Sequence, residues 1–411
     1  MINPLKTSII KCATTRFIES KMTINIPKII LSNEDMFLNI FKDIHENPEL
    51  GFEENRTSKI VQDKLTEFGV DEIHSRIGVT GVVGVIEGRK KSLRSIGIRA
   101  DMDALPIQEK TNLPYSSKVK GKMHACGHDA HTTMLLGAAK YLSETRNFDG
   151  KAILIFQPAE EGLGGATKMI REGVLKKFPC DEIYGMHNWP NQKPNKVEIC
   201  IGPAMAGAAF FDIQIVGKGS HAAAPQNSKD ALLIASTLIT QIQHIISRNI
   251  PPLETCVISV TQIHSGSAYN VIPETAEISG TIRYFSNEIF MLAKTRLEKI
   301  CNGLEISHDI KINIKIRKVF DVLVNDEGLS KAYIDAASDI VGSENTNIEA
   351  APSTGSEDFA DFLKLVPGAY CKLGHGGNVA LHSPEFYLDP KSLSIGSAIL
   401  SRIIEKRMPI T

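Results

Sequence analysis

The alternation of expected strands with expected helices constrains the fold of this chain more than any other feature. Four short apolar runs have the length of buried strands: residues 82–87, 95–100, 152–157 and 182–186. Helical patterns lie before and between them, at residues 32–46, 54–68, 129–142 and 166–172. A pair of parallel strands needs a long crossover connection, which is usually a helix. The sequence therefore predicts an α/β fold with a mostly parallel sheet.

The first expected helix has a start signal and a stop signal. Ser32 followed by Asp35 forms a capping-box pattern, so we expect the helix to begin at Ser32. The Asn47-Pro48 pair should end it, because a residue before proline disfavours the helical conformation.

A second block of elements interrupts the alternation. Its members are strand 210–217, helix 230–248, strands 256–264 and 276–285, helix 287–301 and strand 311–319. The order βαββαβ is that of a ferredoxin-like unit. Patterns of the first kind then resume at residues 327–339, 370–373 and 391–407. The sequence therefore predicts a main domain (32–206 and 320–411) with an inserted domain (207–319).

Residues 1–31 are expected to form an N-terminal extension. They carry five basic side chains against one acid, as an organelle-targeting peptide does. A disordered tail, or a true start at Met22, is the alternative reading of the same segment.

The bulk composition excludes several classes of partner. The net charge of −1 gives no field that would attract nucleic acid or anionic lipid. No apolar run approaches the roughly 20 residues that span a membrane. The seven cysteines include no CxxC pair, which favours a reducing compartment and hence a cytoplasmic protein.

Side chains that bind metal ions recur close to the ends of the expected strands. They are Cys126 and His128 in HACGHDAH, Glu160 and Glu161 in FQPAEEGLGG, His187 after EIYGM, and His382 in ALHSPEF. Ligands of an open α/β sheet bind outside the carboxyl ends of its strands. Thiolate, imidazole and carboxylate together suit a divalent cation such as zinc or manganese. The sequence therefore predicts a metal-dependent hydrolase.

Different jobs are expected within this set. Cys126 and His128 precede a helix, whose dipole favours the thiolate form of the cysteine. The side chains of Glu160 and Glu161 should diverge at a strand end, so that one binds metal while the other takes a proton from water. Asp101 and Asp103 follow the strand at 95–100, where an aspartate either orients a ligand histidine or caps a turn.

Three polar residues of the inserted block form a separate group. His221 stands in GKGSHAAAP, Asn270 in NVIP and Arg283 in GTIRYF. A separate domain could not supply metal ligands, but these side chains could bind substrate where the two domains face each other.

Ten motifs in this order resemble those of one enzyme family. They are ENPELGFEE, RADMDALP, HACGHDAH, QPAEEGLGGA, GMHNWP, GKGSHAAAP, NVIP, GTIRYF, GSEDF and LHSPEF, spread over about residues 36–400. The pattern resembles the amidohydrolase branch of the aminoacylase/carboxypeptidase-type dinuclear metallopeptidases. That branch includes hippurate hydrolase, N-acyl-amino-acid amidohydrolases and indole-acetyl-amino-acid hydrolases.

The resemblance implies two divalent ions, manganese or zinc. Five ligands are implied: Cys126, His128, Glu161, His187 and His382. Cys126 would bridge the ions, where other branches use an aspartate. Asp101 takes the place of a metal-binding histidine of those branches, which leaves one ion with fewer ligands.

The resemblance also implies the catalytic and substrate-binding residues. Glu160 would be the general base, and we also expect Asp103 among the catalytic residues. The inserted domain would mediate dimerisation and place His221 in the partner subunit's active site. Asn270, Arg283, Gly355 and Ser356 would bind the substrate, a small N-acyl amino acid.

Two other readings fit the same residues. A dipeptidase or exopeptidase could use the same metal centre on a different substrate. A catalytically silent metal-binding scaffold would keep the ligands without needing Glu160, and the presence of Glu160 argues against it.

Overall fold

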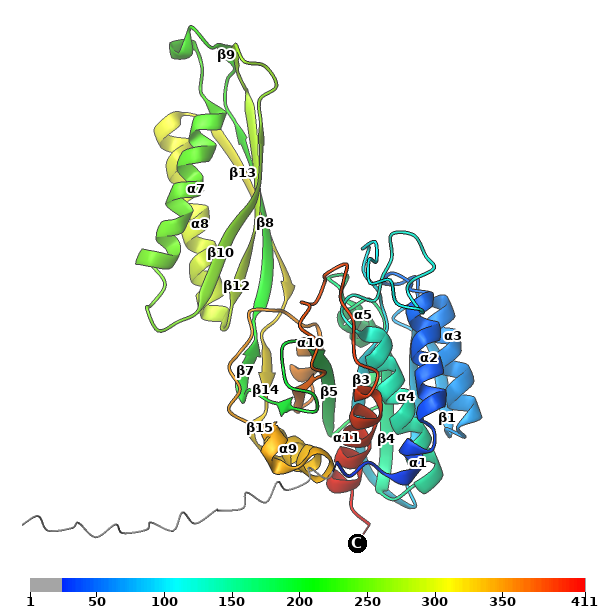
Figure 1. The fold of residues 1–411 in the computed structure, drawn as a ribbon. Coiled ribbons are helices and arrows are strands. Elements are labelled where there is room, and N and C mark those ends of the chain that lie inside the picture. The colour runs from blue at the N-terminus through cyan, green and yellow to red at the C-terminus, as the bar shows by residue number, and fades with distance from the viewer. Residues whose placement is uncertain (1–23, 411) are drawn as a thin grey trace, which may run out of the picture.

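The computed structural model describes residues 24–410, which form a main body and a long lobe that projects from it (Figure 1). The targeting or tail reading of the N-terminal extension falls mainly on residues 1–23, which lie outside the described part. The remainder of that extension belongs to the fold. Helix α1 (Lys28–Leu31) buries Ile30 completely in the core of the body. The packed chain therefore begins before residue 32, where we had placed the domain boundary.

The first helix differs from the capping-box prediction. Helix α2 spans Glu34–Glu46, and its N-cap residue, Asn33, makes no side-chain cap bond. The Ser32 hydroxyl instead donates to the Ile29 carbonyl, because Ser32 is the C-cap of α1. The prediction was wrong because the preceding turn of helix occupies that serine.

A mixed sheet forms the centre of the body. Across residues 24–410, its strands in spatial order are β1 (Glu72–Ile77), β2 (Gly81–Glu87), β4 (Asp149–Gln157), β3 (Lys90–Asp101), β5 (Glu182–Trp189), β16 (Gly368–Gly374), β6 (Val197–Glu198) and β15 (Thr346–Asn347). The central strands β4, β3, β5 and β16 are parallel. The predicted α/β class is confirmed, and the parallel centre sends the carboxyl ends of four strands to one edge.

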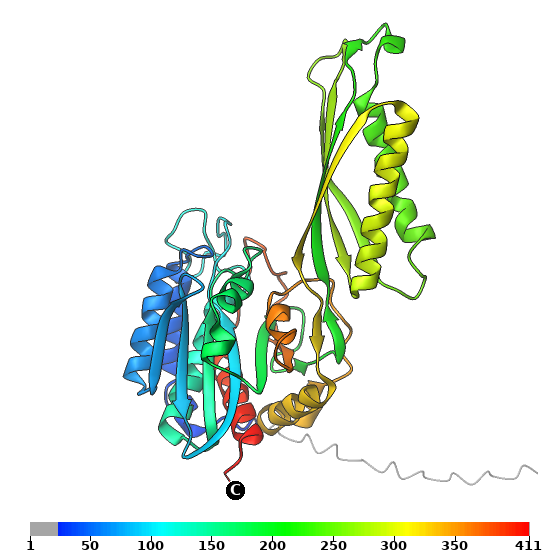
Figure 2. The same ribbon diagram turned by 180° about the vertical axis from the view of Figure 1, so that it is seen from behind.

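Helices cover both faces of this sheet (Figures 1 and 2). One face packs against α1, α2, α3 (Asn55–Glu67), α4 (His128–Thr145), α9 (Glu327–Val341) and α11 (Ser392–Arg407). The other face packs against α5 (Gly165–Arg171), α6 (Val174–Lys177) and α10 (Phe359–Leu363). Neighbouring residues of β2 divide between the faces: Val82 joins the first core and Val83 the second. Burial on both faces explains why these strands are continuous apolar runs.

The lobe has its own sheet and its own core. Its elements are β8 (Gly207–Val216), α7 (Ala231–Arg248), β10 (Cys256–Ser265), β12 (Thr275–Tyr284), α8 (Asn287–His308) and β13 (Lys311–Phe320). The strands are antiparallel in the order β10-β12-β8-β13, and apolar side chains of α7 and α8 pack on one face. This is the βαββαβ order expected from the sequence.

Short elements complete the lobe and its junction with the body. At the far tip, two short strands, β9 (Ser220–His221) and β11 (Val271–Ile272), form an antiparallel pair. The 3-10 turn Pro225–Asn227 lies beside them. Strands β7 (Gly202–Met205) and β14 (Leu323–Asn325) pair where the lobe joins the body. Within residues 24–410, no helix is both long and apolar enough to cross a membrane.

Candidate metal centre

The expected metal-binding residues converge at the carboxyl edge of the parallel strands. Glu160 and Glu161 follow β4, and His187 lies in the last part of β5. Cys126 and His128 stand at the start of α4, beside the end of β3. This convergence is the arrangement that the parallel sheet was expected to produce.

The first group of side chains is buried. The Sγ of Cys126 lies 3.4 Å from Nε2 of His187, and both fall within 4.8 Å of a ring nitrogen of His128. Hydrogen bonds fix the two rings. Nδ1 of His128 is 3.2 Å from Asp103 Oδ1, and Nδ1 of His187 is 2.5 Å from the Asn188 carbonyl oxygen. With Nδ1–H as donor, each Nε2 keeps its lone pair for a metal ion.

The second group contains Cys126, Glu161 and His382, again with ligand atoms within 4.8 Å of one another. Nε2 of His382 lies 3.2 Å from Oε1 of Glu161. The two groups share the sulfur of Cys126. Two three-ligand sets that share one thiol could each hold a metal ion.

The unpaired atoms of these groups fit bound cations. Among the side chains that the structure describes, Nε2 of His128 is buried without a hydrogen bond, and Oε1 of Glu161 is buried with only the ring of His382 beside it. Burial, with repulsion from Glu161, raises the pKa of the Cys126 thiol. The start of α4 alone therefore does not produce the thiolate that we expected from the helix dipole. A cation beside the sulfur would supply the missing stabilisation.

Glu160 occupies a different environment from its neighbour Glu161. It is 6% exposed and faces two further carboxylates, Glu357 and Asp358. Burial, followed by repulsion from Glu357 and Glu161, raises the pKa of Glu160 well above its ordinary value. A carboxylate in such surroundings has an increased affinity for a proton, as a general base requires.

Asp103 ties the two acidic residues to the first group. Its Oδ1 and Oδ2 accept the backbone N–H groups of Glu160 and Glu161, each at 3.0 Å. The same Oδ1 faces Nδ1 of His128. Of the two sequence readings of this aspartate, the geometry agrees with orientation of a histidine.

Asp101 lies beneath the centre in a buried charge network. It pairs with Nη1 of Arg99 at 2.7 Å and with Nδ1 of His131 at 2.6 Å. Arg99 also contacts Glu357 at 2.9 Å and Asp358 at 3.0 Å. Sequence reasoning did not single out Arg99, Glu357 or Asp358. The signal was present, because Arg99 belongs to RADMDALP and both acids belong to GSEDF.

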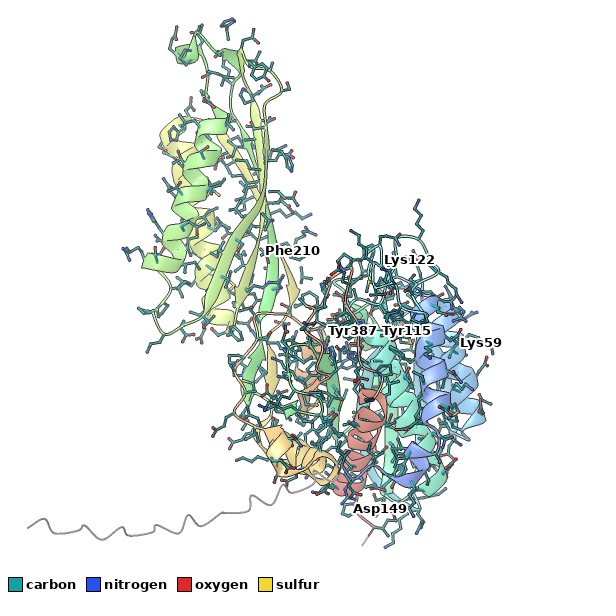
Figure 3. The ribbon with its side chains drawn as sticks, in the orientation of Figure 1. Lys59, Tyr115, Lys122, Asp149, Phe210 and Tyr387 are labelled. Carbon is teal, nitrogen blue, oxygen red and sulfur yellow. The ribbon has the colours of Figure 1, made fainter. Side chains whose placement is uncertain are left out.

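A cavity of about 460 Å³ opens over both groups. Its lining includes Glu160 and four of the five candidate ligands, Cys126, Glu161, His187 and His382. Arg283, Gly355 and Ser356, which the sequence analysis expected to bind substrate, also line it. Nη1 of Arg283 donates to the Ser356 hydroxyl at 2.7 Å, which joins the base of the lobe to the body. The apolar lining consists of Trp189, Met205, Phe210, Phe320 and Leu381. Phe210, on β8, is labelled in Figure 3 where the lobe faces the body.

His221 and Asn270 are not brought to this cavity within the chain. They lie exposed at the far tip of the lobe, where Val271 pairs with His221 and the N–H of Ala222 donates to the Asn270 carbonyl (Figure 1). The three polar residues of the inserted block therefore separate, with Arg283 at its base and the other two at its tip.

Comparison with known proteins identifies the class to which this fold and site belong. Residues 97–406 match Peptidase family M20/M25/M40, and the chain is a member of that family. Hippurate hydrolase of Campylobacter jejuni is 41% identical over 382 residues, which cover 93% of this chain and 99% of that protein. The IAA-amino acid hydrolase ILR1-like 4 of Arabidopsis thaliana is 40% identical, with 89% of this chain and 84% of that protein covered.

A solved structure agrees with this assignment. A dinuclear metal-binding peptidase of the M20 family from Bacillus subtilis superposes with a TM-score of 0.79 at 34% identity. The match covers 91% of this chain and 98% of that one. The resemblance inferred from the ten motifs is confirmed.

Proposed function

We propose that this protein is a metal-dependent amidohydrolase that cleaves the amide bond of small N-acyl amino acids. The observation that carries the proposal is the pair of three-ligand groups sharing Cys126, beside Glu160, with four of their five residues lining one cavity. The names of two relatives, a hippurate hydrolase and an IAA-amino acid hydrolase, support the substrate class.

Two divalent ions, manganese or zinc, are proposed for the centre. Cys126, His128 and His187 would hold one ion, and Cys126, Glu161 and His382 the other. When bound, the ions would supply Lewis acidity that activates a water at neutral pH.

The proposed chemistry of the chain itself rests on Glu160. Its carboxylate takes the proton of the attacking water and then passes it to the nitrogen of the leaving amine. Asp103 holds the backbone of Glu160 and the ring of His128 in fixed relation. The products are a carboxylic acid and a free amino acid.

Arg283 is proposed to bind the carboxylate of the substrate. A guanidinium group can pair with a carboxylate through two parallel hydrogen bonds. The partner of Arg283 in this structure, the Ser356 hydroxyl, is a neutral acceptor that a substrate carboxylate could replace. Gly355 and Ser356 lie beside it on the cavity wall.

One experiment tests the reaction class and its closest alternative together. Metal-free protein is assayed before and after addition of manganese or zinc, on N-acetyl, N-benzoyl and indole-acetyl amino acids and on dipeptides. We expect activity only with metal, and mainly on the N-acyl amino acids. Higher activity on dipeptides would favour an exopeptidase. Full activity without metal would contradict the mechanism, and no activity on any substrate would favour a silent scaffold.

We further propose that the enzyme works as a homodimer in which His221 and Asn270 complete the partner subunit's site. Their position at the lobe tip, away from the cavity of their own chain, supports this arrangement. His221 would stabilise the oxyanion that forms on the acyl carbonyl.

A reducing compartment such as the cytoplasm is proposed as the location, since the six cysteines among residues 24–410 are free thiols.

Subunit complementation tests the role of His221. Inactive His221→Ala is mixed with inactive Glu160→Gln under conditions that exchange subunits. If His221 acts on the partner, one site of each heterodimer carries both defects and the other carries neither. Activity should then recover toward half of wild type per heterodimer. Absence of recovery in proven heterodimers would show that His221 does not act in trans.

A further inference from the structure

A buried amide lies behind the first group of proposed ligands. Asn188 follows His187 at the end of β5, is 0% exposed and does not line the cavity. Its contacts within the protein must therefore explain why a polar side chain is buried there.

Asn188 contacts two of the proposed ligands. Its backbone carbonyl oxygen is 2.5 Å from Nδ1 of His187, so it accepts the ring N–H and directs Nε2 toward Cys126, a bond that any side-chain variant of Asn188 retains. Its side-chain Nδ2 donates to the Cys126 carbonyl oxygen at 2.6 Å. One residue thus fixes the imidazole ring of one ligand and the backbone that carries the sulfur of another.

A chain of buried hydrogen bonds holds Asn188 itself in place. Its backbone N–H and its Nδ2 both point to Nε2 of His131, each at 2.9 Å. His131 must then carry its proton on Nδ1, where it donates to Asp101. Asp101 is in turn paired with Arg99. The orientation of the Asn188 amide is therefore set by His131 and Asp101, which are not among the proposed ligands.

The neighbouring glycine supports a close fit between the loop and this amide. Gly127 lies between Cys126 and His128 and has a φ of +89°, which glycine adopts readily. A Cβ added to Gly127 would lie only 2.1 Å from Nδ2 of Asn188. The loop that carries two proposed ligands thus packs its backbone directly on the amide.

We infer that Asn188 is a positioning residue that sets the geometry of Cys126 and His187 for metal binding. The inference rests on the proposed metal centre and adds a residue to it. Partners that orient metal ligands typically change metal affinity by roughly 10–100-fold when they are removed. The effect should fall first on the ion held by Cys126, His128 and His187.

The test compares Asn188→Ala and Asn188→Asp with a matched control, Asn325→Ala. Asn325 is also a buried amide, 2% exposed, and donates to the carbonyls of Cys200 and Tyr370 away from the ligands. Asn188→Asp keeps the size of the side chain but replaces the donor to the Cys126 carbonyl with an acceptor. The variants therefore separate loss of positioning from loss of a buried polar group.

Cobalt(II) is the probe, titrated into metal-free protein while the thiolate-to-cobalt absorption is followed. We expect both Asn188 variants to bind at least one equivalent roughly 10–100-fold more weakly than wild type. Their thiolate absorption should also change, while Asn325→Ala keeps wild-type binding despite a lower Tm. Gly127→Ala should weaken binding as well, and less so when Asn188 is already alanine.

Failure of the positioning role and failure of the proposed metal centre give different results. If wild type binds two equivalents and both Asn188 variants match its affinities and spectrum, the positioning role is wrong. An Asn325→Ala defect equal to theirs would also overturn it, because buried-amide loss alone would then suffice. If wild-type protein binds no cobalt, the proposed metal centre itself is wrong.

Discussion

The two halves of the candidate metal centre are built from different kinds of structure. His128 and His187 come from a helix and a strand, are buried, and have their Nδ1 atoms hydrogen-bonded from behind. Glu161 and His382 come from loops, and the His382 side chain is 51% exposed. The backbone of His382 has a φ of +64°, a conformation that costs energy for any residue but glycine.

This difference suggests a division of work between the halves. A ligand set held by buried hydrogen bonds is preorganised and loses little freedom when an ion binds. A ligand on an exposed loop must be ordered at that moment, which weakens binding. We therefore expect one tightly held ion on the buried side and one more easily exchanged ion on the loop side, next to the cavity.

The largest effect should come from the residue that both halves share. Cys126→Ala removes one ligand from each group, so we expect loss of both ions and of activity. Metal content after dialysis, measured by atomic emission, checks this directly. A Cys126→Ala protein that kept two ions and wild-type activity would show that the thiol is only a buried apolar group.

The adjacent acids should separate by phenotype. Glu160→Gln should keep both ions and lower kcat by roughly 10²–10⁴, the usual contribution of a general base. Glu161→Gln should instead release the loop-side ion, because of the two proposed ligand sets Glu161 belongs only to the one with Cys126 and His382. Metal content and kcat are measured on the same preparations. The opposite pattern would reverse the assignment of the pair.

The sequence pointed to the candidate ligands of both halves equally well. It could not show which half is held more rigidly. The candidate ligands were singled out because they stand in short motifs close to strand ends, which a local sequence pattern reveals. The supporting bonds were not found: His45 to Asp129 spans 84 positions and Arg99 to Glu357 spans 258. Such pairs form only after the sheet and its helices have packed, so no local sequence pattern predicts them.

The lobe shows the same limit. Its βαββαβ order followed from strand and helix patterns, as did the parallel centre of the body. The edge strand β1 was not predicted, since its residues are exposed or half-buried and form no apolar run. Whether Arg283 and His221 lie at the same end of the lobe depends on strand length and register, which the sequence did not give.

A direct comparison of the halves uses one histidine from each. His187→Ala should weaken the tightly bound ion by more than His382→Ala weakens the other, because His187 is the preorganised ligand. We expect the two losses to differ by about tenfold, measured by competition with a chelator. Equal losses, or a larger one for His382→Ala, would remove the distinction between a rigid and a loop-built half.

The smallest expected effect concerns the scaffold of the buried half. His45 lies against the start of α4, with Nδ1 2.6 Å from Asp129 Oδ2. Burial disfavours its protonation, but hydrogen bonds to Asp129 and Glu109 outweigh burial and raise the pKa of His45 to about 9. Because this value exceeds that of an unfolded histidine, about 6.5, the protonated pair stabilises the fold fully below about pH 6.5. The contribution is lost as the pH rises from there through about 9. In urea unfolding of the metal-loaded protein, the free energy of unfolding should fall over this range by on the order of 1–2 kcal/mol more in wild type than in His45→Gln. Parallel pH profiles for the two proteins would show that His45 is neutral in the folded state and that the buried half does not depend on its charge.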